Sequence, residues 1–128
     1  MRRYLLSQAA ERDIIDILTW SEENFGVAVR RRYQRLVVAA MRDVAANPQL
    51  LGSKDRPELA DGVRTYHLRY SRDRIEGQAI RRPRHFLVYR VRADGNLEIG
   101  RVLHDSRDLE LHLPPEYQPP ESSRGEGA

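Results

Sequence analysis

Two long segments with helical periodicity, separated by one glycine, constrain this chain more than any other feature. In Gln8–Phe25, apolar residues recur every three or four positions with charged residues between them. Gly26 then suits the end of a helix, because glycine adopts left-handed backbone conformations without strain. A second periodic segment, Val27–Ala46, is stopped by Asn47-Pro48. The sequence therefore predicts an antiparallel helical hairpin, in which each helix has an apolar side that another element must cover.

Short segments with strand character flank the hairpin and can form a sheet that covers its apolar side. Tyr4–Leu6 precedes it, and Ser7 is placed to cap the first helix. After the hairpin, Val63–Tyr70 alternates between two sets of side chains, and two further strands, His85–Val91 and Leu97–His104, are joined through an Asp-Gly turn. We predict an α+β fold in the order β-α-α-β-β-β, with the N-terminal strand and helical hairpin packed on a small antiparallel sheet.

The segments between and after these elements predict one domain and a tail. The domain spans residues 1–113 and includes a short C-terminal helix at Asp108–Leu113, since 128 residues leave no room for a second core. Residues 114–128 are rich in Pro, Glu, Ser and Gly, and we predict that they are disordered. Leu51–Gly62 is predicted to be a polar loop and Ser71–Arg84 a long connector rich in arginine.

Composition excludes several classes of function. The chain has no cysteine, hence no disulfide, no thiol nucleophile and no cysteine-based zinc site. Its four histidines, His67, His85, His104 and His112, lack the short spacing of metal ligands, so no metal or cofactor is expected. No apolar stretch approaches membrane-spanning length, and we expect a cytoplasmic protein. The net charge of +3 suits nucleic acid or an acidic protein partner without deciding between them.

Strand alternation places one group of polar residues together. If the alternation is regular, His67, Arg69 and His104, with Phe86, meet at one corner of the sheet face that the helices leave open. Such a cluster could bind phosphate or move a proton. A solvated sheet face that happens to hold two histidines would give the same pattern, and the sequence favours this simpler interpretation.

In the same alternation Arg101 falls on the other side of its strand from His104, so it is predicted to point toward the helices. A charge on that apolar side needs a partner, and Asp105, Asp108 or a carbonyl at a helix C-terminus is the expected one. We interpret Arg101, Asp105 and Asp108 as members of a structural ion pair rather than as catalytic residues, because a buried pair needs no further role.

Several motifs, in this order and spacing, resemble the RelE/ParE superfamily of bacterial type II toxins, and the ParE branch more than the RelE branch. The motifs, spread over about Tyr4 to Leu113, are "LSQAAERDIIDI", "ENFG", "NPQLLG", "GVRTYHLR", "HFLVYRV" and "IGRVLHDSRD". The resemblance implies a compact α+β toxin that is held inactive by a cognate antitoxin, ParD-like, whose acidic C-terminal segment wraps around it. For the ParE branch it also implies that DNA gyrase or another topoisomerase is the target, and that the toxin needs no hydrolytic residues.

The RelE branch supplies the alternative, a ribosome-dependent mRNA interferase. Those ribonucleases place lysines on the strand that matches "TYHLRY" and an arginine early in the next strand. This chain has His67 and Arg69 at the lysine places and Phe86 at the arginine place. An aromatic ring cannot stabilise the negative charge of a phosphoryl transition state. We therefore expect an inhibitor rather than an enzyme, while a substituted site, with His67 and His104 moving protons and Arg69 holding phosphate, stays open.

Two groups of arginines are candidates for binding the antitoxin or the target. Arg30, Arg31 and Arg35 lie on the polar side of the second predicted helix, and Arg81, Arg82 and Arg84 lie in the connector. Runs of charge are more often solvated surfaces than interfaces, so both interpretations are kept.

Overall fold

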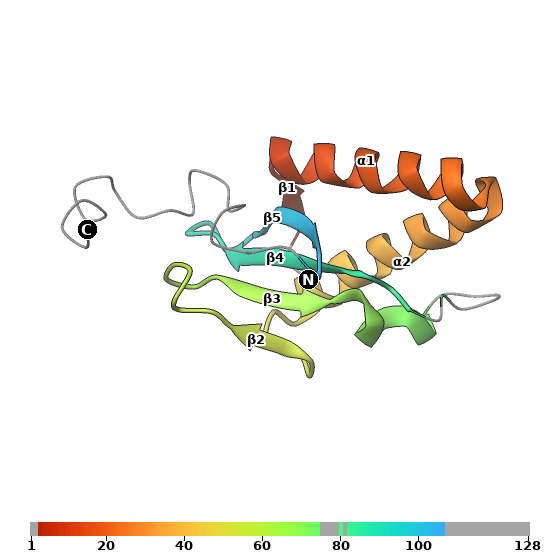
Figure 1. The fold of residues 1–128 in the computed structure, drawn as a ribbon. Helices are drawn as coiled ribbons and strands as arrows, with labels where there is room; N and C mark the ends of the chain where they lie inside the picture. The colour runs from red at the N-terminus through yellow and green to blue at the C-terminus, as the bar shows by residue number, and fades with distance from the viewer. Residues whose placement is uncertain (1–2, 75–79, 81, 107–128) are drawn as a thin grey trace.

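The computed structural model describes residues 3–74, 80 and 82–106, and this part of the chain has the predicted α+β class (Figure 1). Its elements in chain order are β1 (Tyr4–Leu6), α1 (Gln8–Phe25), α2 (Val27–Ala46), β2 (Ser53–Asp55), β3 (Arg64–His67), the 3-10 helix η1 (Leu68–Arg74), β4 (His85–Val91) and β5 (Leu97–His104). The predicted C-terminal helix at Asp108–Leu113 and the predicted tail at 114–128 lie outside the described residues.

Local capping signals fix the helical hairpin. The Ser7 hydroxyl accepts a hydrogen bond from the Ala10 N–H (3.0 Å) at the start of α1 and donates one to the Gly100 carbonyl (2.7 Å). Gly26 has φ 91° and ends α1, where its N–H donates to the Glu22 carbonyl (2.9 Å). One residue thus separates α1 from α2, as predicted.

The sheet has five strands in the order β1-β5-β4-β3-β2. β1 runs parallel to β5, and the other neighbours are antiparallel. The prediction missed β2, which lies inside the segment Leu51–Gly62 that was expected to be a loop. β2 has only three residues, all polar, so no hydrophobic alternation indicated it.

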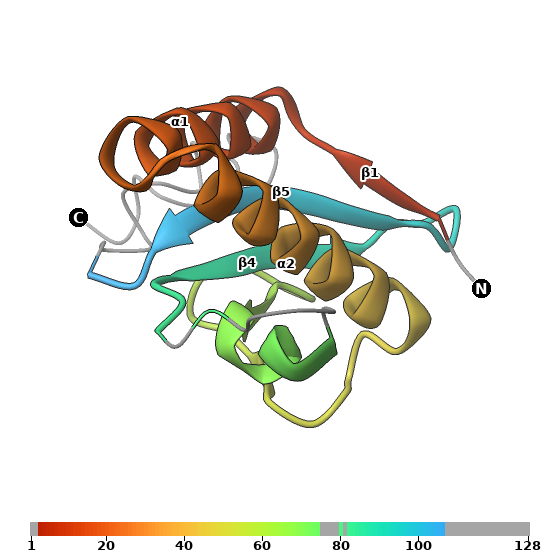
Figure 2. The same ribbon diagram turned by 90° about the vertical axis from the view of Figure 1, so that its right-hand side faces the viewer.

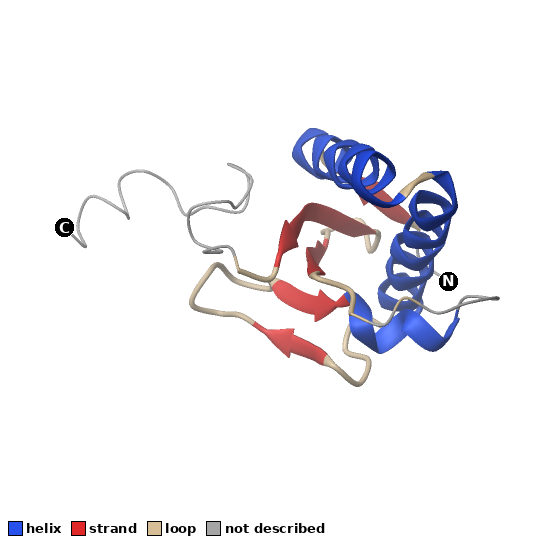
Figure 3. Ribbon diagram, turned by 45° about the vertical axis from the view of Figure 1, so that its right-hand side comes forward, coloured by secondary structure: helices blue, strands red, loops and turns tan. Residues whose placement is uncertain are grey.

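The helices pack on one face of the sheet, and the main core lies between the two layers (Figure 3). Figure 2 shows α2 running across β4 and β5. Leu36, Ala40 and Val44 on α2 are fully buried in this core. The same core includes Leu68 of η1 and the sheet residues Tyr66, Leu87, Tyr89, Leu97, Ile99 and Val102.

The opposite face of the sheet carries a second, smaller apolar cluster. It consists of Leu59, Val63, Phe86, Val88 and Leu103, with Ala60 packed against it. Leu59 and Ala60 belong to the segment between β2 and β3, so this segment covers part of the face on which the sequence predicted solvent. The expectation of a solvated face is therefore wrong at Phe86, which is only 9% exposed.

β3 is shorter than predicted. The sequence indicated a strand from Val63 to Tyr70, but the chain turns after His67 into η1. The Ser71 hydroxyl donates to the Asp43 carboxylate on α2 (2.6 Å) and shares a hydrogen bond with the Tyr66 hydroxyl (2.8 Å). These contacts, together with the complete burial of Leu68, fix η1 beneath α2 and outweigh the local alternation.

A β-bulge in β5 changes which side chains face the helices. Tyr89 pairs with Ile99, whereas Val88 pairs with Arg101, so Gly100 has no partner on β4. Beyond the bulge, Val102 joins the main core and Leu103 joins the second cluster. The sequence assumed unbroken alternation and placed Leu103 under the helices and His104 on the open face. Both placements are wrong, because the extra residue shifts the alternation by one.

Candidate functional site

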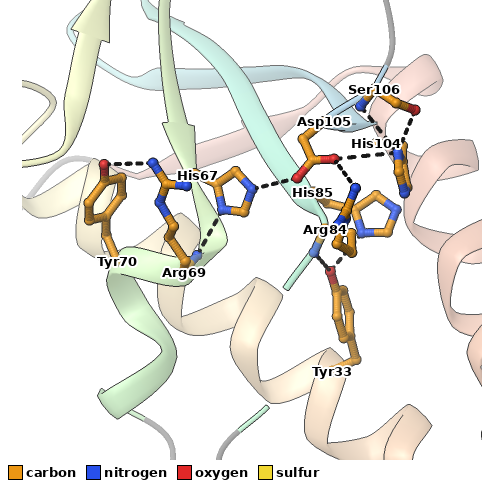
Figure 4. Close-up of polar contacts among 9 residues, drawn as sticks. All are labelled: Tyr33, His67, Arg69, Tyr70, Arg84, His85, His104, Asp105 and Ser106. Carbon is orange, nitrogen blue, oxygen red and sulfur yellow. Dashed lines mark hydrogen bonds and ion pairs between the residues drawn. The ribbon is translucent and has the colours of Figure 1, made fainter. Parts of the chain in front are cut away.

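Polar side chains gather where β3 ends, β4 begins and β5 ends, and we call this group the histidine corner (Figure 4). Its members are Tyr33, His67, Arg84, His85, His104 and Asp105. The three strand ends meet at one edge because β4 is antiparallel to both of its neighbours. The predicted meeting of His67 and His104 occurs, although their contact runs through Asp105 rather than across one sheet face.

Asp105 lies at the centre of the histidine corner. One carboxylate oxygen, Oδ1, lies 3.1 Å from Arg84 Nη2 and 3.6 Å from His104 Nδ1, and the other, Oδ2, lies 3.1 Å from His67 Nε2. Burial alone would raise the pKa of Asp105, but the hydrogen bond with His67 and the charges of Arg84 and His104 lower it overall. The carboxylate is therefore held ionised among groups that are positive or can become so.

Both ring nitrogens of His67 are engaged. Nδ1 accepts a hydrogen bond from the Arg69 backbone N–H (3.1 Å), so Nε2 carries the proton and donates to Asp105. Burial lowers the pKa of His67, the charges of Arg69 and Arg84 lower it further, and the contact with Asp105 opposes them. At neutral pH His67 is uncharged, and it cannot take a proton without losing one of these contacts.

A second chain of contacts runs from α2 to β5. The Tyr33 hydroxyl accepts from the Arg84 N–H (3.2 Å), which leaves its own proton to bond His85 Nδ1 (2.6 Å). Burial raises the pKa of Tyr33 to about 12, and burial next to His104 lowers the pKa of His85 to about 4. The rings of His85 and His104 meet edge to face, with centroids 5.4 Å apart.

Sequence reasoning missed Tyr33 and His85 as members of this site. Tyr33 lies on the apolar side of α2, within the main core, where the sequence pattern indicates packing rather than a polar site. His85 was counted among the histidines but given no role, although it is the residue opposite His104 in the register of the two strands. That register was the available signal, since cross-strand neighbours contact each other.

Two members of the predicted cluster lie elsewhere. The Arg69 guanidinium stacks 4.9 Å from the centre of the Tyr70 ring and bonds the Tyr70 hydroxyl (3.1 Å), pointing away from Asp105 (Figure 4). Phe86 is buried in the second apolar cluster. Arg69 is displaced because β3 ends at His67, so the strand geometry that would have placed it beside His67 does not continue.

The predicted ion-pair partner of Arg101 must be corrected. Its guanidinium bonds both carboxylate oxygens of Asp13 on α1, at 2.7 and 2.8 Å, and the Val102 N–H donates to the same carboxylate (3.0 Å). Asp105 belongs to the histidine corner instead, and Asp108 lies outside the described residues. β1 pairs with β5 only as far as Ile99, which leaves the outer side of β5 open to Asp13 beyond that point.

The candidate binding arginines fall into different environments. Arg31 and Arg35 line a groove of about 510 Å³ on the outer side of α2, whose other lining residues are Gln34, Val38, Ala39, Arg42 and Arg74. Arg30 instead pairs with Glu22 on α1 (3.0 Å). Of the connector arginines, Arg82 is exposed, Arg84 contacts Asp105, and Arg81 lies outside the described residues.

The arginine groove is strongly positive. Within the described part of the chain, no acidic side chain lies within ion-pair distance of Arg31, Arg35 or Arg42, while Arg74 lies 3.6 Å from Asp43. Val38 and Ala39 give the groove an apolar floor. The same part of the chain contains no cluster of three or more ligating side chains that could hold a metal ion. Nor does it contain a helix long and apolar enough to cross a membrane.

Comparison with known proteins adds an independent line of information. Residues 4–109 match the family model described as the ParE toxin of the type II toxin-antitoxin system parDE. The chain is 30% identical over 111 residues to Toxin ParE1 of Mycobacterium tuberculosis, which covers 87% of this chain and 97% of that protein. It is 32% identical over 113 residues to Toxin ParE1 of Caulobacter vibrioides, covering 88% and 99% respectively.

Proposed function

This chain belongs to the ParE toxin family of type II toxin-antitoxin systems, and from that membership we propose that it arrests growth by binding and inhibiting DNA gyrase or a related topoisomerase. The proposal includes neutralisation by a cognate antitoxin. It requires a binding surface on the toxin and no hydrolytic chemistry of its own.

The proposal rests on one observation: the candidate catalytic groups are already engaged in contacts within the protein. RNA cleavage needs a free base, a free acid and a positive group at the reacting phosphate. In the histidine corner, His67 has both nitrogens engaged and Arg84 is neutralised by Asp105. Phe86 is buried at the position where a RelE-type ribonuclease would place arginine. These contacts favour binding over cleavage.

The arginine groove supports the proposed antitoxin interaction. Arg31, Arg35 and Arg42 follow one another at intervals of four and seven residues, which places them along one side of α2. An amphipathic helix with carboxylates at matching intervals can pair with them while its apolar side covers Val38 and Ala39. We propose that the acidic C-terminal segment of a ParD-like antitoxin binds here.

Two assays performed side by side test the proposed target. The purified toxin should inhibit supercoiling by gyrase and increase cleaved DNA, and adding purified antitoxin should reverse both effects. The same preparation should leave mRNA intact on translating ribosomes. Absence of any effect on gyrase and on related topoisomerases, at toxin concentrations that arrest growth, would contradict the proposal.

The alternative, a RelE-like mRNA interferase with a substituted site, draws on one observation. His67 and His104 both contact Asp105, so two imidazoles do lie near one point. Ribosome-dependent cleavage that His104→Ala abolishes, in a variant whose circular dichroism and melting temperature match the wild type, would establish this function instead. Arg69→Ala would then be expected to weaken cleavage only if its guanidinium turns away from Tyr70.

A further inference from the structure

Three groups that carry or can acquire positive charge converge on the single carboxylate of Asp105. They come from different parts of the fold: His67 from the end of β3, Arg84 from the segment before β4, and His104 from the end of β5. The Arg84 and His104 side chains are 57% and 40% exposed, so the cluster opens to solvent. His67 Nε2 and the Arg84 guanidinium face the two carboxylate oxygens as donors, with His104 beside them, and converging charge-assisted donors are how proteins bind oxyanions.

Each of these three residues also makes a contact, through its ring or its backbone, that does not involve the Asp105 side chain. His67 Nδ1 is fixed by the Arg69 N–H, and the Arg84 backbone N–H bonds the Tyr33 hydroxyl. His104 Nδ1 accepts the Ser106 backbone N–H (3.2 Å) and contacts the Ser106 hydroxyl (2.7 Å), so His104 lies beside the carboxylate without donating to it through this nitrogen. Asp105 itself is fixed by its backbone N–H, which donates to the Arg84 carbonyl (2.8 Å). The His67 ring and the Arg84 backbone are therefore held in place without the Asp105 carboxylate.

We propose that the histidine corner is an oxyanion site that the chain fills with its own Asp105 carboxylate, and that phosphate binds to Arg84 and His67, next to His104, when this carboxylate is removed or displaced. Phosphate fits better than a second carboxylate, because its additional oxygens can also reach the Ser106 hydroxyl beside His104. The proposal does not depend on the toxin's target.

The covalent connection of Asp105 to β5 explains why the site is already occupied in the native chain. Asp105 follows β5 directly, so its carboxylate is present at the site at an effective concentration far above that of a dissolved competitor. A free phosphate ion at millimolar concentration therefore loses the competition. The Asp105 carboxylate thus acts as an internal competitor, and phosphate can bind only where residue 105 moves or loses its charge.

The test is a titration of Asp105→Ala with sodium phosphate at pH 7.5 and constant ionic strength. Binding is followed through the histidine ring signals in proton–carbon NMR spectra. We expect saturable shifts of His67 and His104 with a Kd of a few millimolar, on the order of weak charge-assisted binding. The wild type should bind at least tenfold more weakly. Asp61→Ala provides the matched control, because it removes the same charge from an exposed turn outside the corner.

Further variants tie the binding to the corner. Arg84→Ala combined with Asp105→Ala should abolish the saturable shifts. Asp105→Asn keeps the shape of the side chain without its charge and replaces Asp105→Ala if the alanine variant does not fold. A short single-stranded oligonucleotide without terminal phosphates, titrated in parallel, separates a nucleic-acid phosphodiester from free phosphate as the source. Saturable binding of either ligand at the corner supports the proposal.

Three results would overturn it. The first is no saturable binding of phosphate or oligonucleotide in folded Asp105→Ala or Asp105→Asn. The second is equal phosphate binding in the wild type, Asp61→Ala and Asp105→Ala, which would mean that Asp105 does not fill the site. The third is acetate binding to Asp105→Ala as tightly as phosphate, which would contradict the assignment of the ligand.

Discussion

Asp13 is the residue on which the contact between α1 and β5 most depends. Its carboxylate accepts two hydrogen bonds from Arg101 and one from the Val102 backbone N–H. The side chains of Asp13 and Arg101 are 14% and 20% exposed, so the pair is largely shielded from water. Removing one partner from such a pair leaves a charge and a backbone donor without their acceptor, which costs more than the pair itself contributes.

We therefore predict that Asp13→Ala lowers the free energy of unfolding by about 2–4 kcal/mol. Urea unfolding monitored by circular dichroism measures the loss. Asp16→Ala, an exposed residue of the same helix, is the matched control and should change stability by less than about 0.5 kcal/mol. Equal stabilities of the two variants would show that Arg101 does not need Asp13.

His85 makes the stability of the protein depend on pH. Its folded-state pKa of about 4 lies below the unfolded value of 6.5, because the ring is buried and lies beside His104. As the pH falls, the unfolded chain binds the proton first. Stability from the neutral ring is thus fully present above pH 6.5 and is lost between pH 6.5 and about 4, by up to about 3 kcal/mol.

A series of urea unfolding experiments between pH 7.5 and 4 tests this dependence. His85→Gln does not titrate and can still accept the Tyr33 proton, so its stability should fall less steeply over this range. His67, whose pKa is also lowered, contributes in the same direction in both proteins. Parallel pH profiles for the wild type and His85→Gln would mean that His85 is not the group responsible.

The contacts of individual residues could be predicted from the sequence only in part. The sequence indicated that Arg101 forms a structural ion pair, because a charge among apolar strand residues requires one. It did not indicate Asp13, which is 88 positions away and is brought close by the parallel pairing of β1 with β5. Gly100 inside a strand pattern was a visible sign of a bulge. Regular alternation was nevertheless assumed, and His104 was placed on the wrong face.

At the scale of elements, η1 depends on an approach that only glycine permits. A Cβ atom on Gly52 would lie 2.7–3.0 Å from atoms of the Tyr70 ring, and Gly52 has φ 98°. Gly26 between the helices also has a positive φ of 91°, but a Cβ atom there would meet nothing within 4 Å. A substitution at Gly26 therefore tests backbone strain alone, whereas a substitution at Gly52 tests backbone strain together with steric conflict.

We predict that Gly26→Ala destabilises the protein by about 1–2 kcal/mol through backbone strain alone. Gly52→Ala should cost more, roughly 2–4 kcal/mol, because Tyr70 must also move away from its present position. Thermal and urea unfolding of both variants measure the difference. A smaller loss for Gly52→Ala than for Gly26→Ala would mean that the Tyr70 ring can move without cost.

Element boundaries were predictable where the determining interactions are local. Ser7, Gly26 and Pro48 mark the helix ends in the sequence, and the helices begin and end where predicted. The end of β3 was not predictable in this way. It is set by Ser71 contacting Asp43, 28 positions away, and no pattern within Val63–Tyr70 distinguishes a strand of four residues from one of eight.

For the whole molecule, the distribution of charge matters more than its total. The chain carries a net charge of +3, but its ion pairs are uneven. Arg30 is paired with Glu22 and Arg84 with Asp105, whereas Arg31, Arg35 and Arg42 face the groove without an acidic partner among the described residues. A partner with carboxylates would be steered to this side, and its attraction would weaken as salt rises.

The last prediction concerns the complex with the proposed antitoxin. Replacing Arg31 and Arg35 together by Glu turns attraction into repulsion along the groove, and we expect the complex to weaken by about 100-fold or more at 150 mM salt. Isothermal titration calorimetry at several salt concentrations measures the effect, and the salt dependence of the variant's affinity should be much smaller. The change should leave the fold intact, because Arg31 and Arg35 are exposed.

Arg12→Glu is the matched control, since Arg12 is an exposed arginine on α1 that does not line the groove. It should change the affinity by less than about threefold, because a charge outside the contact surface acts only through screened, longer-range forces. Equal weakening by Arg12→Glu and by the groove variant would show that net charge, not the groove, governs antitoxin binding. Unchanged affinity of the groove variant would place the antitoxin on another surface. The inhibition of gyrase by that variant, measured in the same preparation, would then show whether the groove serves the target instead.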